Sequence, residues 1–522
     1  MPSLEICQQW PPEAESYART QTSPPYLLVM LLILVAPAIL VADWPMWGGS
    51  PARNMANLAE QNIATEWDVA SGKNIRWSAQ IGSFCYGNPV VANGRVFVGT
   101  NNANPRNPQI QDDRGVLMCF NAHTGEFLWQ AVHEKLPSGR ENDWPQQGIG
   151  STCAVDGNRV YYVSNRCTLV CADTEGFRDG RNDGIQNEKY QGPFDADFVW
   201  ELDMMRDLKV YPHFLATSSP LVVDDLVFVH TSNEPDENGL LIPEPESPSF
   251  IAVDKHTGRV VWQDNSPGDR LLDGQWSSPT YGRVNGQGQV YFPGGDGWLY
   301  AFDPKGDPDH PSRSRLIWKF DCNPPGSQVG RAGRGTVNAI LSTAVFDDNR
   351  VYIGVGQNPD HGEGTGHLYS IDATRTGDVS EFIGDWDPKR RAKVNATKNP
   401  NSALIWHFGD KDFGRTISTV AIRGELLFAV ELAGFLHCLD VRTGRPHWKH
   451  DMLSYVWGSP AAIGNHVYLG DEDGDVCVLA ASSDFEMLHE MHMNERITGT
   501  AIASGGVLYL ASTNRLFAIA TK

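Results

Sequence analysis

The decapeptide NAHTGEFLWQ occupies residues 121–130, and the similar stretches DKHTGRVVWQ and DVRTGRPHWK occupy residues 254–263 and 440–449. Each stretch has Asn or Asp at its first position, Thr-Gly at its fourth and fifth positions, and Trp at its ninth. An Asn or Asp side chain can accept amide hydrogens of the turn that it begins, and glycine takes a positive φ at no steric cost. The stretch therefore predicts a strand, a tight turn and a second strand that ends in Trp.

These stretches belong to a repeating unit of about 40 residues. Each unit opens with a pair of small residues, followed by two short apolar runs separated by a turn, a pattern typical of a β-hairpin. The openings begin at Asn88, Ser151, Ser219, Ser278, Ser342, Ser418, Ser459 and Thr500. Each opening with its two further strands makes a four-stranded sheet. The pattern predicts an all-β fold, an eight-bladed β-propeller over residues 74–522.

The two ends of the repeat region suggest how the ring closes. The eighth unit stops one strand short, and the stretch KNIRWSAQI at residues 73–81, which contains Trp77, lies before the first opening. We expect this N-terminal strand to complete the C-terminal blade, because closure removes two exposed sheet edges. Residues 43–73 then form a lead-in.

The repeated tryptophans are predicted to be structural. They are Trp129, Trp200, Trp262, Trp318, Trp406 and Trp448, with no counterpart after the seventh opening. A buried Trp covers about 150–250 Å², enough to fix one sheet against the next. The third strands carry small residues at one shared position, and these are Cys119, Cys171, Ala252, Ala301, Ser370 and Cys438. Because Ala and Ser also occupy this position, we interpret its cysteines as small packing residues.

Composition and charge restrict the class of protein. Of 522 residues, 41% are hydrophobic and 20% charged, and the net charge is −21. A nucleic-acid partner requires a basic face that replaces the counterions of the phosphates, so this balance argues against one.

Residues 1–42 carry a separate signal. The apolar run at residues 26–42 is short for a membrane span, which needs roughly 20 apolar residues, but it suits the apolar core of a signal peptide. We expect an exported protein, in the periplasm or outside the cell. A retained membrane anchor through residues 26–42 is the alternative.

Four insertions break the rhythm of the repeat and are predicted to be surface loops. They span residues 173–197, 233–249, 357–367 and 378–402. In the first, Asp179, Asp183 and Glu188 resemble a loose Ca²⁺ loop, since Ca²⁺ prefers several oxygen ligands. Their spacing departs from the strict calcium-loop pattern, so a solvated loop is the other interpretation.

Residues just before each opening are expected to gather at one mouth of the central channel. In blade order they are Tyr86, Gln147, His213, Trp276, Arg334, Arg415, Trp457 and Arg496, with Arg331 close to Arg334. Arginine pairs with carboxylates and Trp stacks on flat rings, so this set suits a small planar anionic ligand. The alternative is that they are ordinary rim residues.

The small-residue openings, the A-x-D-x-x-TG-x-x-x-W stretch, the eight units and the closure between the chain ends resemble the pyrroloquinoline-quinone (PQQ) repeat propellers. That superfamily includes quinoprotein alcohol dehydrogenases and the propeller lipoprotein of the outer-membrane β-barrel assembly machinery. The stretches QWSSPTY, FPGGDGWLYAFD and GQNPDHGEGTGHLYSID further resemble secreted PQQ-repeat proteins of bacterial cell envelopes. The resemblance covers residues 44–522 and implies the fold, while one fold hosts many functions.

The resemblance to the dehydrogenases implies a possible site. Those enzymes hold PQQ at a channel mouth with a Ca²⁺ ion and an aspartate base. By resemblance, Asn233 takes the metal position, Asp273 the position of the base, and Arg334 lies near the cofactor. A carboxylate placed there can remove the alcohol proton as hydride leaves.

The chain departs from that pattern at three points. The stretch VSNRCTL has no carboxylate where the dehydrogenases have a metal-binding Glu, Gly295 stands at their cationic position, and adjacent cysteines are absent. We therefore expect an exported binding or scaffold module of the cell envelope, with a protein partner or a small planar anionic ligand. A PQQ- and Ca²⁺-dependent dehydrogenase that oxidises an alcohol or sugar is the alternative.

Overall fold

The computed structural model describes residues 43–236, 239, 241–272, 274–329, 335–387 and 392–521. The chain divides into a short first unit, Met1–Leu40, and a compact second unit, Val41–Lys522. The signal or anchor predicted for residues 1–42 lies outside the described residues. Within the described part of the chain, no helix is long and apolar enough to cross a membrane.

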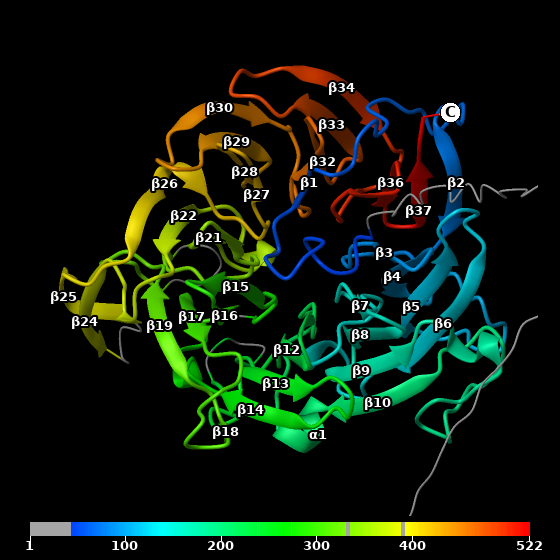
Figure 1. The fold of residues 1–522 in the computed structure, drawn as a ribbon, viewed down its shortest axis with the longest axis horizontal. Coiled ribbons are helices and arrows are strands. Elements are labelled where there is room, and N and C mark those ends of the chain that lie inside the picture. Colours follow the sequence, from blue (N-terminus) through cyan, green and yellow to red (C-terminus); the bar gives the residue numbers. More distant parts are fainter. Residues whose placement is uncertain are drawn as a thin grey trace, which may run out of the picture. The chain divides into compact units, whose positions relative to one another are not determined.

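The second unit is an eight-bladed β-propeller, and Figure 1 shows its blades arranged around a central axis. Each blade is built on four antiparallel strands, and β1 (Ala56–Asn57) joins the sheet of blade 7 as a parallel fifth strand. Blades 1 to 4 consist of β3 (Val90–Ala92), β4 (Arg95–Asn101), β5 (Arg114–Asn121) and β6 (Phe127–Glu134); β7 (Ala154–Asp156), β8 (Arg159–Val163), β9 (Thr168–Asp173) and β10 (Phe198–Asp203); β11 (Leu221–Val223), β12 (Leu226–His230), β13 (Phe250–Asp254) and β14 (Val260–Asp264); and β15 (Thr280–Val284), β16 (Gln287–Pro293), β17 (Trp298–Phe302) and β19 (Leu316–Asp321).

The remaining blades follow the same plan. Blades 5 to 8 consist of β20 (Val345–Asp347), β21 (Arg350–Val355), β22 (Thr365–Asp372) and β26 (Leu404–Gly414); β27 (Ala421–Arg423), β28 (Leu426–Val430), β29 (Phe435–Asp440) and β30 (Pro446–Asp451); β31 (Ala461–Ile463), β32 (His466–Gly470), β33 (Asp475–Ala480) and β34 (Met487–His492); and β35 (Ile502–Ser504), β36 (Val507–Ala511), β37 (Arg515–Ile519) and β2 (Ile75–Gln80). In the last blade, β2 pairs antiparallel with β37, and Trp77 lies opposite Ala518.

Smaller elements decorate the blades. Strands β18 (Ser312–Arg313) and β23 (Gly377–Asp378) add parallel edges to blades 3 and 4, and β24 (Phe382–Asp387) pairs with β25 (Ala392–Lys398) as a separate hairpin. The helical elements are α1 (Met204–Leu208), η1 (Gly139–Glu141), η2 (Gly176–Asp179), η3 (Gly268–Arg270) and η4 (Pro359–His361).

Every repeat tryptophan lies opposite a small residue of the third strand. The pairs are Cys119–Trp129, Cys171–Trp200, Ala252–Trp262, Ala301–Trp318, Ser370–Trp406 and Cys438–Trp448. Directly opposed side chains share one patch of the sheet face, so a large indole leaves room only for a small partner. The eight cysteines within the described residues are buried free thiols.

The same tryptophans bridge neighbouring blades. Six indole N–H groups donate to backbone carbonyls of the next blade at 2.9–3.1 Å, from Trp77, Trp129, Trp200, Trp262, Trp406 and Trp448 to Ala122, Thr174, Lys255, Pro304, Val441 and Ser482. Trp318 instead donates to Gln289 Oε1 of its own blade at 3.0 Å. The turn glycine receives the indole: at Gly258, with φ +72°, a Cβ atom would lie 2.6 Å from the Trp200 ring.

Residues 44–60, which we call the strap, lie inside the ring of inner strands (Figure 1, dark blue). Hydrogen bonds of 2.8–3.1 Å join the strap to every blade in turn, at Val91, Val155, Ser219, Tyr281, Phe346, Ile422, Ala462 and Ala503. The Arg53 guanidinium is fully buried and donates to the carbonyls of Trp47, Ser219, Pro220 and Pro279 at 2.9–3.1 Å. Burial lowers the pKa of Arg53 to about 9. The strap therefore ties the eight blades together from inside the ring.

Candidate binding site at the channel mouth

A cavity of about 270 Å³ lies where the residues before the openings converge. Four of the predicted mouth residues line it, namely Tyr86, Gln147, Trp276 and Trp457. The other residues that shape it are Trp47, Trp144, Gly150, Thr152, Phe214, Leu215, Thr217, Ser219, Ser278, Leu341, Thr343, Asn358, Pro359, Asp360, Ile417 and Thr498. The prediction that the inter-blade segments meet around one space is thus supported for these four positions.

Aromatic rings from several blades contribute to the wall. The Tyr86 and Trp457 ring centroids are 5.9 Å apart at an interplanar angle of 48°, and Trp144 meets Phe214 edge-on at 4.8 Å. Trp276 adds a third indole from the segment between blades 3 and 4. Flat, apolar faces with a few polar groups are typical of a small-molecule site.

The strap contributes Trp47 to the cavity. The indole N–H of Trp47 donates to Thr419 Oγ1 at 3.2 Å, and its carbonyl accepts from Arg53 at 2.9 Å. These bonds hold the ring in place from two directions. Sequence reasoning missed Trp47 because it lies outside the repeat.

Three buried polar atoms at the cavity have no hydrogen-bond partner among the described residues. They are Gln147 Oε1, Thr217 Oγ1 and Trp276 Nε1. Each of these atoms is buried within the wall and is not exposed to the open space of the cavity. Gln147 Oε1 can only accept a hydrogen bond, Trp276 Nε1 can only donate one, and Thr217 Oγ1 can do both.

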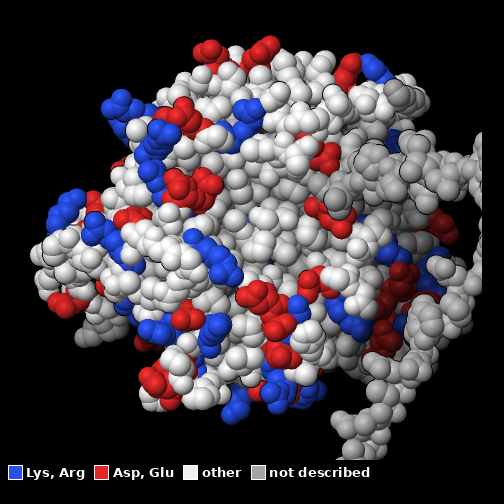
Figure 2. All heavy atoms as spheres, viewed as in Figure 1, with Lys and Arg blue, Asp and Glu red and all other residues white. Residues whose placement is uncertain are grey.

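The described lining is acidic rather than cationic. Asp360 is its one carboxylate, and it contains no Lys or Arg within the described residues. Close by, Glu472 accepts from Trp457 Nε1 at 3.1 Å and pairs with Arg496 at 3.0 Å. Burial, together with Glu472 and Asp360, raises the pKa of Tyr86. Figure 2 shows one face of the ring, where charged side chains gather toward the outer part and the centre is mostly uncharged.

Two other predicted mouth residues take positions behind the cavity wall. Arg415 is buried and donates to the carbonyl of Gly335 at 2.8 Å and to those of residues 361–363 at 3.4–3.5 Å. It thereby holds the insertion at 357–367, which supplies Asn358 and Asp360 to the lining. His213 is also buried, outside the lining residues, and its neighbour Phe214 reaches the cavity instead.

Only some of the residues proposed by resemblance to the dehydrogenases are among those that the structure describes. Asp273, Arg331 and Arg334 lie outside the described residues. Asn233 is buried, its side-chain oxygen accepts from Tyr211 N at 3.0 Å, and its amide donates to the Glu244 carbonyl at 2.8 Å. Both ends of the Asn233 amide thus make a hydrogen bond within the protein, and calcium binding at Asn233 stays a prediction.

Glu234, next to Asn233, links two segments of the mouth. Its carboxylate accepts from the backbone N–H of His213 at 2.9 Å and from that of Gln275 at 2.5 Å. This bridge fixes Phe214 and Trp276 relative to each other. The insertion at 233–249 therefore positions the cavity wall.

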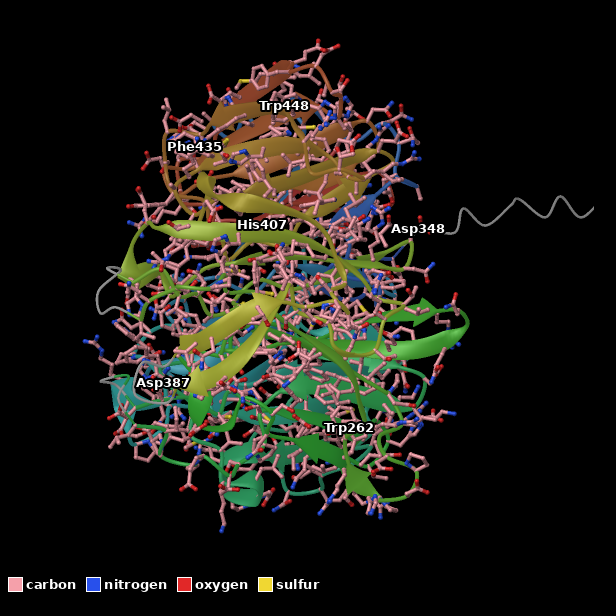
Figure 3. All side chains as sticks on the ribbon, turned by 90° about the vertical axis from the view of Figure 1, so that its left-hand side faces the viewer. Trp262, Asp348, Asp387, His407, Phe435 and Trp448 are labelled. Carbon is pink, nitrogen blue, oxygen red and sulfur yellow. The ribbon has the colours of Figure 1, made fainter. Side chains whose placement is uncertain are left out.

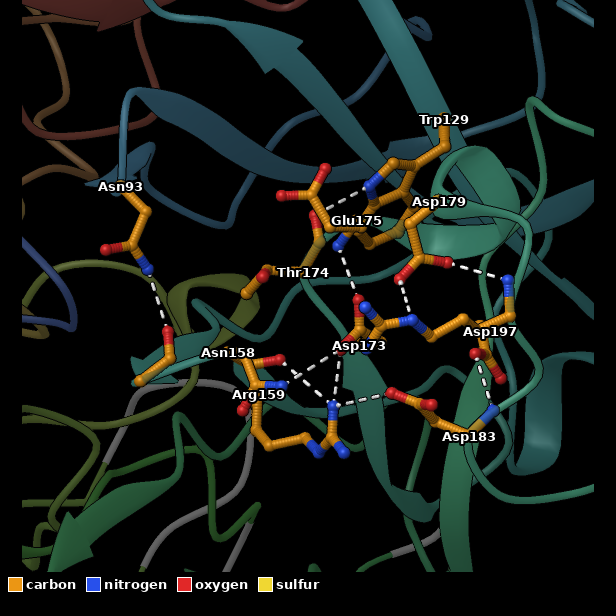
Figure 4. Close-up of polar contacts among 12 residues, drawn as sticks. Asn93, Trp129, Asn158, Arg159, Asp173, Thr174, Glu175, Asp179, Asp183 and Asp197 are labelled. Atoms are coloured by element: carbon orange, nitrogen blue, oxygen red, sulfur yellow. Dashed lines mark hydrogen bonds and ion pairs between the residues drawn. The ribbon is translucent and has the colours of Figure 1, made fainter.

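The acidic insertion is drawn in Figure 4, and its carboxylates contact groups of the loop itself or Arg159 of β8. Asp179 accepts from Arg181 N at 2.9 Å, Asp183 lies 3.5 Å from Arg159, and Glu188 accepts from Asn182 at 3.1 Å. Among the described residues, no three His, Cys, Asp or Glu side chains are arranged to hold a metal ion. Calcium binding at Asp179, Asp183 and Glu188 stays a prediction.

A simple signal in the sequence would have found more of the lining. The residue two positions before the opening lines the cavity in five blades, as Tyr86, Thr217, Trp276, Trp457 and Thr498. Blade 3 has Thr217 at that offset, whereas His213 lies six positions before Ser219. A constant offset is a better guide because the inner strands enter the mouth in equivalent registers.

Repeat, blade number and mouth together define a PQQ-repeat β-propeller. A profile of the family described as "Outer membrane protein assembly factor BamB" matches residues 57–139, 113–378 and 390–522, so the chain belongs to this family. No curated protein matches the chain.

Solved structures share the fold. The chain is similar to BamB from Moraxella catarrhalis, with a TM-score of 0.53 and 13% identity over 85% of this chain and 98% of that one. It also matches the quinohemoprotein alcohol dehydrogenase from Comamonas testosteroni, with a TM-score of 0.46 and 12% identity over 91% of this chain and 80% of that one. At 13% identity the likeness to the Moraxella protein concerns the fold alone.

Proposed function

We propose that this protein is an exported, non-enzymatic binding module that holds a protein partner at the cell envelope. Membership of the BamB family supports a cell-envelope role. Eight blades tied by the strap make a rigid support, and the insertions project from it. Loops on a rigid scaffold are the usual place for partner binding.

The hairpin β24–β25 is the observation that carries this proposal. It stands at the edge of the ring in Figure 1 and toward the viewer in Figure 3, where Asp387 marks its end. Ile383 and Trp386 are each 37% exposed. An isolated two-stranded hairpin with open edges and exposed apolar side chains is marginal alone and gains stability when a partner covers it.

An ion pair near the turn of the hairpin ties it to blade 4. Lys393 Nζ lies 2.8 Å from the Asp321 carboxylate and donates to the Phe382 carbonyl at 2.7 Å. Both charged side chains are nearly buried, so this pair resists solvent screening. The hairpin is therefore presented in one orientation.

The dehydrogenase alternative has less support. The described lining offers a carboxylate and no cation, whereas PQQ is a polyanion that needs cations. The Asn233 amide already makes one hydrogen bond through its oxygen and one through its nitrogen within the protein. We expect no PQQ- and Ca²⁺-dependent reduction of an artificial electron acceptor with a panel of alcohols and sugars, and turnover would establish the enzyme.

Site-specific photo-crosslinking in the source organism tests the proposal. A crosslinking amino acid replaces Trp386, and a second variant carries it at Phe485, an aromatic residue of blade 7 that is more exposed, at 46% against 37% for Trp386. We expect one discrete adduct with an envelope protein from position 386, lost on adding Ile383→Asp, and none from position 485. No adduct, or identical adducts from both positions, would contradict the proposal.

A further inference from the structure

We propose that the protein partner of the hairpin β24–β25 presents an acidic segment, which binds the cationic surface where this hairpin meets blade 4. The inference rests on the proposed function, because it names the chemistry of the partner that the hairpin holds. We call this surface the basic face, and it consists of Arg270, Trp298, Lys319, Trp386 and Lys393.

Three cations surround the indole of Trp298 at the start of β17. Lys319 Nζ lies 4.8 Å from the ring centroid, Lys393 Nζ 5.1 Å and Arg270 Cζ 5.9 Å. Lys393 comes from the hairpin, whereas Lys319 lies in β19 of blade 4 itself. The electron-rich face of an indole attracts cations, but it does not neutralise their charge.

Two of these three cations are neutralised by carboxylates within the protein. Arg270 lies 3.2 Å from the carboxylate of Asp296, and Lys393 lies 2.8 Å from that of Asp321. The ammonium group of Lys319 makes no ion pair or hydrogen bond with any residue that the structure describes, although the residue is partly buried. The basic face therefore has one positive charge without a counterion. Because charges are screened less at a partly buried position than in open solvent, an anion is favoured there.

The hairpin segment is basic in an otherwise acidic chain. Residues 382–398 contain five Lys or Arg and two Asp in the sequence, a net charge of +3, whereas the whole chain carries −21. Trp386 lies directly opposite Lys393, so the two side chains project from the same face of the hairpin. Complementary charge favours an acidic partner, and Trp386 offers that partner an apolar contact beside the cations.

An acidic protein segment fits this surface better than an anionic membrane. Lipid surfaces of this kind are bound by clusters of about four to eight Lys or Arg. Here Lys393 and Lys398 are paired with carboxylates of the protein, and β24 also carries Asp385 and Asp387. A single unpaired ammonium beside a partly exposed indole matches one Asp or Glu side chain with an apolar neighbour.

Photo-crosslinking from position 386, carried out in an envelope preparation of the source organism, tests the inference. Lys319→Gln removes the unpaired charge and Lys319→Arg keeps it. Lys305→Gln is the matched control, because Lys305 is an exposed lysine at the opposite end of β17 from Trp298. We expect Lys319→Gln to lower the yield of the adduct about tenfold, as expected for a lost charge pair at an interface. Raising the salt from about 0.05 M to about 0.5 M should lower it as well, whereas Lys319→Arg and Lys305→Gln should leave it unchanged.

A stability measurement separates loss of binding from loss of folding. Because Lys319 has no counterion within the described residues and lies beside two other cations, Lys319→Gln should not lower the free energy of unfolding. Chemical denaturation checks this.

The crosslinked peptide of the partner is then identified by mass spectrometry, and we expect it to contain more Asp and Glu than Lys and Arg. An adduct that Lys319→Gln leaves unchanged, that Lys319→Arg also loses, or whose peptide is neutral or basic would overturn the inference and leave the proposed function standing. Sedimentation with phosphatidylglycerol vesicles but not with phosphatidylcholine vesicles, abolished by Lys319→Gln, would identify a membrane instead and would also overturn it. Absence of any adduct from position 386 contradicts the proposed function, and this inference with it.

Discussion

The seam between blades 3 and 4 and the seam between blades 7 and 8 solve one packing problem in different ways. At the first, Trp262 of the repeat is 1% exposed and donates to the Pro304 carbonyl of the next blade at 2.9 Å. At the second, the repeat has no tryptophan, and Val478 lies opposite His489 in blade 7. Trp67 of the lead-in is 3% exposed there and donates to Met493 Sδ at 3.0 Å.

Trp67 packs in one cluster with residues of both blades, including Met491 of β34 and Phe517 of β37. The substitute comes from outside the repeat, yet it supplies the same apolar area at an equivalent junction. The comparison shows that each seam requires a large buried ring, and that its source in the chain can vary.

The largest effect is expected for Trp262→Ala, which breaks a seam of the repeated type. Truncating a buried Trp costs about 3–5 kcal/mol of the free energy of unfolding, and we expect about 4 kcal/mol here. Chemical denaturation measures it. Trp386→Ala on the exposed hairpin is the control and should change stability by less than about 0.5 kcal/mol.

Trp67→Ala tests whether the indole at the seam between blades 7 and 8 contributes as much to the free energy of unfolding as Trp262 does. We expect a loss of about 3 kcal/mol, slightly less than for Trp262, because thioether sulfur is a weak acceptor and little hydrogen bonding is lost. The same denaturation experiment applies. A loss as small as that of Trp386→Ala would show that the lead-in is not part of the seam.

A matched glycine pair sharpens the comparison at the turn. Gly258 and Gly94 both have φ +72°, but a Cβ at Gly258 would meet the Trp200 ring at 2.6 Å, whereas nothing lies within 4 Å at Gly94. Alanine at either position adds left-handed backbone strain, and at Gly258 it also forces the indole away. We expect Gly258→Ala to cost about 2 kcal/mol more than Gly94→Ala in thermal or chemical unfolding. Equal losses would mean that the indole does not require the glycine.

The smallest effect concerns pH and the buried His230 of blade 3. Its Nε2 lies 2.8 Å from the Pro293 carbonyl of blade 4, and burial lowers the pKa of His230 to about 3. Above pH 6.5 the imidazole is neutral in the folded and the unfolded chain, so it adds no pH dependence. As pH falls below 6.5, the unfolded chain binds a proton that the folded chain does not, and stability is lost.

We expect His230 to account for about 1 kcal/mol of the stability lost between pH 6.5 and 5.5. His230→Gln should flatten the dependence of unfolding free energy on pH in this window. His133, whose pKa burial lowers to about 4, adds a second contribution at the seam between blades 1 and 2. An unchanged slope in His230→Gln and in the corresponding His133→Gln would show that neither imidazole governs the acid sensitivity.

Much of the fold could be predicted because the repeat is local. The Asn or Asp, the Thr-Gly pair and the Trp fall within ten residues, and each acts on a turn or on its own sheet face. The third-strand position of Cys119 and Ala252 was predicted to be small, and the structure gives the reason in the indole opposite each of them. The predicted mouth was found in part: Trp276 and Trp457 line the cavity.

The sequence by itself determined the eight units, their strands, the small third-strand position and the place of each repeat tryptophan, since these depend on the pattern within one repeat. Only the tertiary structure decided the strap, the substitution of Trp67 at the seventh seam and the place of Trp47 in the cavity. Asn54 bonds Ile422 across 368 residues of chain, and a contact that long leaves no periodic trace for the sequence to reveal. Local spacing encodes a blade, whereas the interior of the ring is fixed by hydrogen bonds and packing that form only once all the blades are assembled.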